Sequence, residues 1–446
     1  NLDIESDKIN SGGSIYIETA GDLSNKNREI NAGENVVISA TNIYNNLVVG
    51  DGELRSPSII AGKIASLTAS NNIENIGGTI EAGTYAYLNA GGDIINSLAK
   101  TRLGGGENYA DSNLGGGTIS GTDIVLISGS DILMEGGSLV SSNETYLESQ
   151  GDINIQTATL EERSVRRSKK AYDEVYSLTN VGSSISTGGA LTISSGGDTT
   201  MSGSNVSSVG DTNIITGGNF NLVSALDQET EIHNFNGGRR NVIDERHKLT
   251  QVGSELNSEG AISIKAVENT NIISSNIDSS GVLEILAGEE INILSSSNYE
   301  SRYVRQKKKG FIGYNSSESS SEIIGTDQIK GELLSGLNLT STSGGDTNIV
   351  ASNLTSGGDL VMESGGVVRI GVDKNTDQAS YKLDNGNVFW YRKLGQGSYK
   401  EEVVHSELVS DTGVHNISGT NGVEVEYDST GTSSDSTRER ISGLVS

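Results

Sequence analysis

Aliphatic residues in the second half of the chain recur in a pattern that repeats over long distances. The first residues of the successive copies are Ile185, Leu256, Leu333 and Leu408, which lie 71, 77 and 75 positions apart. The four sets are Ile185, Leu191, Ile193, Met201 and Val206; Leu256, Ile262, Ile264, Ile272 and Ile277; Leu333, Leu337, Leu339, Ile349 and Leu354; and, in degenerate form, Leu408, Ile417, Val423 and Val425. A repeat of this kind indicates a modular, elongated fold.

Each copy contains a smaller unit. The triplets Leu191-Thr-Ile193 and Ile262-Ser-Ile264 alternate apolar and polar residues, which is typical of a short strand with one buried face. Further apolar residues follow after clusters of Gly, Ser, Asp and Asn, which favour turns. The pattern restarts after 21 residues, from Leu191 to Thr212. Three short strands per turn of about 21 residues predict an all-β parallel β-helix, a solenoid in which each coil pairs with the next.

Residues 1–158 follow the same pattern less regularly. Ile73 to Ile94 and Ile132 to Ile153 are both 21 residues. Two inserts, at about 45–60 and 97–117, interrupt the coils, and the glycines of the second predict a flexible loop. Asn42, Asn75 and Asn96 are expected at turns, where turn chemistry is favoured over a stacked ladder of side-chain amides. The predicted strands are marked by Ile15/Ile17, Val36/Ile38, Ala86/Leu88, Ile124/Leu126 and Ile153/Ile155.

Four excursions interrupt the coils from residue 159 onward, at 159–180, 227–251, 298–328 and 374–405. They hold 12 of the 20 aromatic residues and 19 of the 31 Lys and Arg. Their 17 acidic residues leave a charge of about +2, against −29 for the rest of the chain. The sequence therefore predicts two segments: 1–158, and 159–446 with its four charged excursions.

The excursions have the composition of β-hairpin arms. Asn385-Gly386 and Gly310 or Gly313 are candidate hairpin turns. One interpretation, which we favour, is that the arms fold back on neighbouring coils so that their lysines neutralise the acidic shaft. The other is that they contact a receptor or a lipid surface. The candidate contact residues are Arg166, Arg167, Lys169, Lys170, Tyr172, Arg302, Tyr303, Arg305, Lys307, Lys308, Phe311, Phe389, Trp390, Tyr391 and Arg392.

Composition narrows the function class. Only 33% of residues are hydrophobic and 4% aromatic, both low for a globular enzyme, yet the regular spacing of Ile, Val and Leu argues against disorder. The absence of cysteine excludes disulfides and thiolate metal sites. A net charge of −27 disfavours nucleic acid or an anionic membrane as a partner of the whole surface. The opening residues resemble no signal peptide, and the repeat is under way by Ile15, so we expect an internal piece of a longer polypeptide.

The residues that mark the repeat also carry a resemblance. The phrases GSSISTGGALTISSGGDTTMSGSNVSS and SGGDTNIVASNLTSGGDLVMESGG, with interruptions such as YVRQKKKGFIGYNSSESSS, resemble the haemagglutinin repeats of filamentous-haemagglutinin-type exoproteins. These are exported by two-partner secretion in Gram-negative bacteria and include adhesins and contact-dependent growth inhibition effectors. The resemblance implies a right-handed β-helical filament, an outer-membrane transporter as export partner, and action at the cell surface. The secretion domain and any carboxy-terminal toxin are not in this sequence.

Other parallel β-helices process polysaccharides, so catalytic and metal-binding patterns in the sequence bear on its function. No Asp-Asp pair is present, and Arg369-Ile370 is followed by glycine rather than lysine. Paired carboxylates for acid–base catalysis are therefore not predicted. The histidines lack metal-ligand spacing, and neither a cofactor nor a metal is expected. Four aspartates that follow glycine are predicted to cap turns: Asp198, Asp211, Asp346 and Asp359.

Function is then expected to follow from shape. Without the excursions, 336 residues would form about 16 coils of ~21 residues and a shaft roughly 75 Å long. We predict a monomeric, non-enzymatic filament segment that mediates adhesion or reach toward a receptor on a host cell or target bacterium. The alternative is a delivery segment of a growth-inhibition effector that engages the target outer membrane. A polysaccharide-processing enzyme is a remote third hypothesis.

Overall fold

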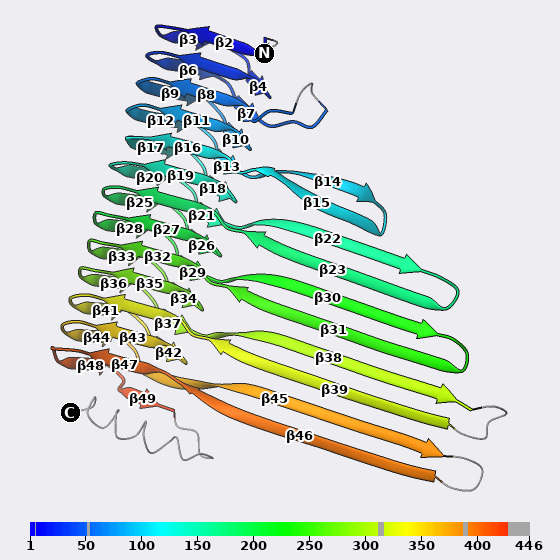
Figure 1. Ribbon diagram of the computed structural model, residues 1–446. Helices are drawn as coiled ribbons and strands as arrows, with labels where there is room; N and C mark the ends of the chain where they lie inside the picture. Colours follow the sequence, from blue (N-terminus) through cyan, green and yellow to red (C-terminus); the bar gives the residue numbers. More distant parts are fainter. Residues whose placement is uncertain (5, 51–53, 311–315, 387–390, 427–446) are drawn as a thin grey trace.

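A computed structural model of the chain shows a straight β-helical shaft with a flat sheet projecting from one side (Figure 1). The structure describes residues 1–426 except 5, 51–53, 311–315 and 387–390. The early strand β2 (Lys8–Ser11) and the last described strand, β49 (Val423–Val425), lie at opposite ends of the shaft. Three long parallel sheets, A, B and C, run the length of the shaft, and each coil contributes one strand to each sheet.

The strands of the shaft are short, and most have four to six residues. Sheet A contains β1 (Leu2–Asp3), β4 (Leu23–Lys26), β7 (Ile43–Asn46), β10 (Ile73–Ile76), β13 (Ile94–Ser97), β18 (Ile132–Glu135), β21 (Ile153–Gln156), β26 (Thr199–Ser202), β29 (Phe220–Val223), β34 (Thr270–Ile273), β37 (Ile291–Leu294), β42 (Thr347–Val350), the start of β45 (Val368–Gly386) and β49 (Val423–Val425).

Sheet B contains β2 (Lys8–Ser11), β5 (Glu29–Ala32), β8 (Ser58–Ala61), β11 (Thr79–Ala82), β16 (Thr118–Gly121), β19 (Ser138–Ser141), β24 (Ser184–Thr187), β27 (Asn205–Ser208), β32 (Glu255–Ser258), β35 (Asn276–Ser279), β40 (Glu332–Ser335), β43 (Asn353–Ser356) and β47 (Glu407–Ser410). Sheet C contains β3 (Ile15–Glu18), β6 (Val36–Ala40), β9 (Ile64–Ala69), β12 (Tyr85–Ala90), β17 (Asp123–Ser128), β20 (Thr145–Ser149), β25 (Leu191–Ser195), β28 (Thr212–Thr216), β33 (Ile262–Ala266), β36 (Leu283–Ala287), β41 (Leu339–Ser343), β44 (Leu360–Ser364) and β48 (His415–Gly419).

The coil length predicted from the sequence is confirmed by the strand register. Leu191 pairs with Thr212 in sheet C, and Ile73 pairs with Ile94 in sheet A. Ile193, Ile264 and Leu339 are completely buried inside the coil, as the alternating pattern requires. Each coil therefore buries its aliphatic side chains against those of its neighbours, and the hydrophobic core extends along the shaft.

Two details of the repeat differ from the prediction. Leu337 is 56% exposed at a turn, and Leu339 pairs with Leu283, so the third copy is Leu339-Thr-Ser341 rather than Leu337-Asn-Leu339. Sheets B and C each contain thirteen strands within the described residues, not the roughly 16 coils predicted. One reason is that the estimate counted the insert at 97–117, which contains a hairpin, as coil residues.

A buried ladder of amides runs along sheet A in the first half of the shaft. Asn25 Nδ2 donates to Asn45 Oδ1 (2.7 Å), Asn45 to Asn75 (2.7 Å) and Asn75 to Asn96 (2.8 Å). Turn chemistry was therefore the wrong interpretation for Asn75 and Asn96, which lie inside strands and are buried. Asn42 does lie at a turn. Stacking identical side chains at the coil spacing satisfies polar groups that burial would otherwise leave unpaired.

The connection from sheet A to sheet B alternates between two forms along the shaft. In one coil it is a tight turn with a left-handed residue, and in the next it is an excursion. The left-handed residues, with φ between 44° and 66°, are Asn27, Gly77, Gly136, Gly203, Ser274 and Ala351. The repeat therefore consists of two coils and one excursion, which explains why its length exceeds three times that of a coil.

Candidate functional site

The excursions form five hairpins, which we call arms 1 to 5. All pair edge to edge in one antiparallel sheet, the wing (Figure 1). The arms lengthen from the first to the fifth. They are arm 1, β14 (Ala99–Gly105) and β15 (Asn108–Gly115); arm 2, β22 (Ala158–Arg167) and β23 (Ala171–Val181); arm 3, β30 (Ala225–Asn236) and β31 (Arg240–Val252); arm 4, β38 (Ser296–Lys309) and β39 (Ser316–Ile329); and arm 5, β45 from Val372 and β46 (Tyr391–His405).

The spacing of the coils explains why the arms join. Two coils separate each arm from the next, a rise of about 9.6 Å at ~4.8 Å per coil. A hairpin is two strands wide, which is the same distance at the same strand spacing. Each arm therefore emerges one hairpin width from the last, and its outer strand can pair with the first strand of the following arm.

Three expectations for the excursions are corrected. Residues 97–117, expected as a flexible loop, contain arm 1, in which Arg102 pairs with Asp111 across the hairpin. The arms extend away from the shaft and pair with one another, rather than folding back on the coils. Backbone pairing satisfies a full strand edge, which is more than scattered lysine contacts with the shaft could do. The turn expected at Asn385-Gly386 is also wrong, because both residues are still paired within arm 5.

The arm roots are joined by a recurring side-chain cap. Asp227 Oδ1 accepts the backbone N–H of Asn180 (2.8 Å), Asn298 Oδ1 accepts that of Gln251 (2.7 Å), and Asn375 Oδ1 accepts that of Gln328 (2.6 Å). The capping residues Asp227, Asn298 and Asn375 lie 71 and 77 positions apart, the spacing of the repeat. The register between successive arms is thereby fixed where they leave the shaft.

Ion pairs cross the boundaries between arms. Arg102 Nη2 lies 3.0 Å from Glu161 of arm 2, and Arg302 Nη2 lies 2.9 Å from Asp244 of arm 3. Hydrogen bonds from Arg302 hold the pKa of the Asp244 carboxyl below its usual value, and Arg102 does the same for Asp111. These carboxylates are therefore ionised acceptors that help to hold neighbouring strands together.

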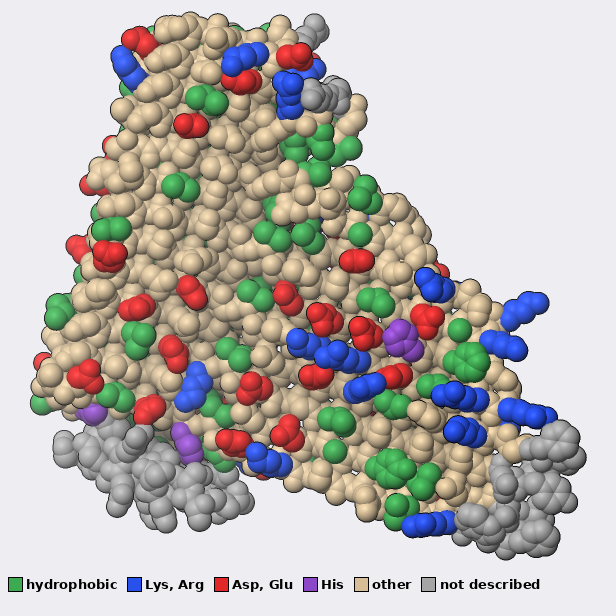
Figure 2. Space-filling model, in the orientation of Figure 1, with side chains coloured by type: hydrophobic (Ala, Val, Ile, Leu, Met, Phe, Trp, Pro, Cys, Tyr) green, Lys and Arg blue, Asp and Glu red, His purple; other side chains and the backbone are tan. Residues whose placement is uncertain are grey.

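Both faces of the wing are open to solvent. Beyond the arm roots, Val165 is the one buried hydrophobic residue among the described wing residues. Leu103, Val175, Phe235, Ile323 and Tyr381 are 36–59% exposed, and the strand register places all five on one face. Apolar and charged side chains mingle on the wing (Figure 2). A sheet without a core on either side presents its side chains for contact.

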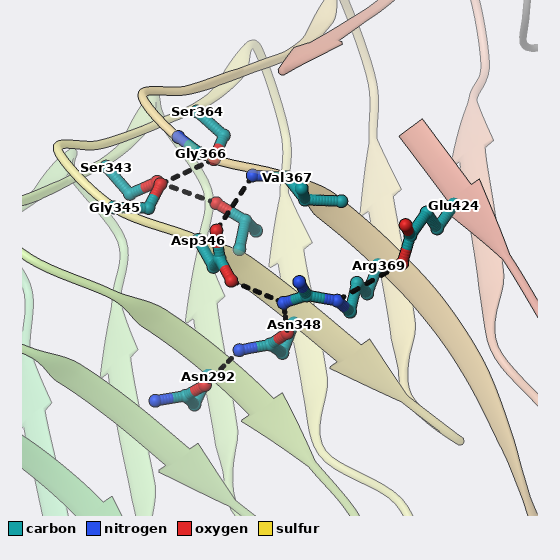
Figure 3. A network of polar contacts seen from close by, with 11 residues as sticks. Asn292, Ser343, Gly345, Asp346, Asn348, Ser364, Gly366, Val367, Arg369 and Glu424 are labelled. Carbon is teal, nitrogen blue, oxygen red and sulfur yellow. Dashed lines mark hydrogen bonds and ion pairs between the residues drawn. The ribbon is translucent and has the colours of Figure 1, made fainter. Parts of the chain in front are cut away.

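The aspartates singled out in the sequence cap successive coils. Asp198 Oδ1 accepts the N–H of Asn219 (2.7 Å), and Asp346 Oδ1 that of Val367 (2.8 Å). Asp346 also pairs with Arg369, which reaches Glu424 at 3.3 Å (Figure 3). The N–H of Val367 and then Arg369 lower the pKa of Asp346, the opposite of what a general acid needs. Turn capping is thus confirmed for this residue.

The comparisons with known proteins identify the repeat. Residues 168–242 and 235–382 match the family described as Hemagglutinin repeat. Residues 168–382 are therefore similar to hemagglutinin repeats. Such repeats are typical of filamentous-haemagglutinin-type exoproteins, which are typically secreted, in a two-partner secretion context, and they are generally structural rather than catalytic. No curated protein and no solved structure matches the chain.

The matched hemagglutinin-repeat residues begin at the turn of arm 2, between β22 and β23, and end within β45, the first strand of arm 5. Across the described residues, no cluster of three or more potential metal ligands occurs, and no helix has the length and hydrophobicity to cross a membrane.

The predicted contact residues separate into paired and exposed groups. Arg167 pairs with Glu107 (2.6 Å), Arg302 with Asp244, and Arg305 and Lys307 with Glu318. Tyr172 and Tyr303 are half-buried on the wing. Phe311, Phe389 and Trp390 lie outside the described residues, as does the side chain of Tyr391. The exposed cations among the predicted residues that form no ion pair within the described part of the chain are Arg166, Lys169, Lys170, Lys308 and Arg392.

The structure adds cations that the sequence reasoning missed. Arg239, Arg240, Lys309 and Lys393 lie exposed at the free ends of arms 3, 4 and 5. Gly237-Gly238 just before Arg239 was the available signal, since it marks a hairpin turn. Lys and Arg gather toward the outer edge of the wing in Figure 2. We call this edge the basic rim, made of Arg166, Lys169, Lys170, Arg239, Arg240, Lys308, Lys309, Arg392 and Lys393.

Proposed function

We propose that this chain is a non-catalytic segment of a surface exoprotein, in which the shaft provides reach and the wing contacts another cell. The observation that supports this best is the wing itself. A spacer needs only coils, whereas this chain also forms five hairpins, which join in a continuous sheet with both faces exposed to solvent. Charged, aromatic and aliphatic side chains on such a sheet have the composition of a contact surface.

Export and location follow from the same proposal. The transporter would be the outer-membrane partner of two-partner secretion, and the segment would act at the surface of a Gram-negative bacterium. A chain without cysteine needs no oxidative step after crossing the membrane. Each coil pairs mainly with its neighbours, so folding can proceed coil by coil outside the cell. We also propose that 1–158 acts mainly as shaft and 159–446 as the contact segment.

Removal of the wing tests the proposal. In a variant, the two-residue turn Gly203-Ser204 of the alternate coils replaces each of arms 2 to 5. We expect the wing-less shaft to keep its β-sheet circular dichroism and to lose binding to recipient cells. Binding is measured with fluorescently labelled samples of the intact chain and the variant. If the wing-less shaft binds cells as well as the intact chain does, the wing is not the contact surface and the proposal fails.

A second candidate function is delivery, in which the wing engages the target outer membrane so that a carboxy-terminal toxin can pass. The exposed hydrophobic residues on one face of the wing, such as Phe235 and Ile323, favour it. The two functions differ in what crosses into the recipient. A reporter enzyme fused after residue 446 should enter recipient cells if the segment delivers, and should stay outside if it only adheres.

A further inference from the structure

The basic rim is built by the alignment of four arm ends. Arg240 pairs with Lys308, Lys308 with Ser317, Ser317 with Asn385, and Asn385 with Arg392, so one row across five strands contains three cations. The backbone N–H of Lys309 donates to the carbonyl of Arg239 (2.7 Å), which joins the end of β38 in arm 4 to the turn of arm 3. The described part of the chain contains no ion pair of Lys170, Lys308 or Lys309.

Distance separates the rim from the acidic shaft. Arm 4 has strands of 14 residues, which extend about 45 Å at ~3.3 Å per residue. The Debye length at physiological ionic strength is about 8 Å, so the shaft's negative charge is screened at the rim. An anionic partner can therefore be attracted by the rim although the whole chain has a net charge of −27.

The cations surround the edge of the sheet rather than lining one face. Alternation along the strands places Arg240 and Lys308 on one face and Lys309 on the other. On that second face, a hollow of about 240 Å³ is lined by Asn241, Ile243, Arg305, Lys307 and Lys309. A linear polyanion in a groove would need cations on a single face. A flat anionic surface touched by the edge would meet both.

We propose that the basic rim docks edge-on onto a membrane surface rich in anionic lipid, where its lysines and arginines bind headgroup phosphates. The proposal rests on the proposed function, in which the wing is the contact surface, and names the chemistry of the partner. The rim spans eight strands, about 35 Å, which is enough for several headgroups. Phosphates in the hollow would face Lys309 together with Arg305 and Lys307, whose charge is partly balanced by Glu318.

Vesicle binding tests the proposal with the chain as it stands. We expect co-sedimentation with phosphatidylglycerol–phosphatidylcholine vesicles that weakens at high ionic strength, and none with phosphatidylcholine alone. The rim variant Lys170→Gln/Lys308→Gln/Lys309→Gln should bind roughly a hundredfold more weakly, since each cation near an anionic surface contributes about 1 kcal/mol. The matched control Lys26→Gln/Lys63→Gln/Lys265→Gln removes three exposed lysines from the shaft and should bind like the unmodified chain.

The other outcomes overturn the inference. Equal binding by the rim variant and the shaft control would show that overall charge, not the rim, decides. Rim-dependent binding to a soluble sulfated glycan, with no binding to vesicles, would show that the partner is a polyanionic glycan and not a membrane. Circular dichroism and thermal unfolding of both variants check that they fold. Failure of the membrane-docking proposal is distinct from failure of the proposed function. If cell binding depends on the wing but not on the rim, the docking proposal fails and the proposed contact function of the wing stands.

Discussion

Two residues with left-handed backbone conformation in alternate coils, Gly203 and Ser274, contact the roots of the arms. A Cβ added to Gly203 would lie 2.6 Å from Thr157 Cγ2 and 2.7 Å from the Cβ of Ala225, the first residue of arm 3. The equivalent Ser274 instead donates or accepts a hydrogen bond with Ser296 at the root of arm 4 (2.6 Å). In both cases the left-handed residue packs against an arm root 22 positions later.

Substitution of Gly203 tests this packing. We expect Gly203→Ala to lower the free energy of unfolding by about 3 kcal/mol, because a left-handed backbone costs ~1–2 kcal/mol for alanine and the new methyl collides with Ala225. Thermal and denaturant unfolding measure the change. The control is Gly238→Ala at the turn of arm 3, where φ is 77° and an added Cβ would meet no atom within 4 Å. Equal losses in the two variants would show that backbone strain, not the contact with the arm root, determines the cost.

At the scale of elements, the arms are hairpins that would be marginal alone and are stabilised by one another. Pairing runs for ten residue pairs between β31 and β38 and is reinforced by Arg302–Asp244 and Arg246–Glu300. The shaft strands depend on buried aliphatic side chains, whereas the wing depends on backbone pairing and ion pairs at partly exposed positions. The two parts of the molecule should therefore respond differently to pH.

Acid should loosen the wing before the shaft. Arg302 lowers the pKa of Asp244, and Lys307 and then Arg305 lower that of Glu318. A carboxyl whose pKa is lower in the folded than in the unfolded state stabilises the folded state at every pH above its unfolded-state pKa, which is about 4. This stabilisation is lost as the pH falls through the lowered, folded-state pKa. Hydrogen exchange, corrected for intrinsic rates, should accelerate in β31 and β38 below about pH 4 and stay slow in β33.

Asp244→Asn provides the comparison for the acid response. The variant cannot lose a proton at this position, so β31 should exchange faster at neutral pH and change less on acidification. Acid-induced exchange that is the same in β31 and β33 would contradict the view that ion pairs hold the wing.

At the scale of the whole molecule, the structural unit is two coils and one arm. Ser183 Oγ donates to the carbonyl of Gln156 and Ser254 Oγ to that of Val223, both at 2.7 Å, so residues 71 positions apart make the same contact. The shaft advances by two coils while the wing advances by one hairpin. Because the units interact mainly with their neighbours, one should be removable without loss of the others.

Deletion of 184–254 removes one whole unit and joins Ser183 to Glu255. We expect β19 to pair with β32 and β23 with β38, with the melting temperature changed by only about 5 °C and the β-sheet circular dichroism per residue unchanged. The control deletes 184–244, which leaves residues 245–252 of β31 without β30, their hairpin partner, and should reduce solubility and cooperativity. Similar behaviour of the two deletions would contradict a modular unit.

The sequence predicted the coils well because the signal is local and periodic. Ile193 and Ile264 are buried as the alternation required, and arms 2 to 5 lie within two residues of the predicted excursions. The errors occurred where the position of a residue within the coil outweighs the preference of its side chain for burial or exposure. Leu337 is as apolar as Leu339 but lies at a turn, and Asn75 looks like a turn residue but is buried between Asn45 and Asn96.

The sequence by itself therefore determined the repeat, the coil and the approximate limits of the arms, since these depend on which residues can be buried every 21 positions. Only the tertiary structure decided that the arms form one wing, because their pairing depends on the equality between two coil rises and one hairpin width. The basic rim exists for the same reason. Lys170, Arg240 and Lys308 are far apart in sequence, and stacking of the coils is what aligns the arm ends along one edge.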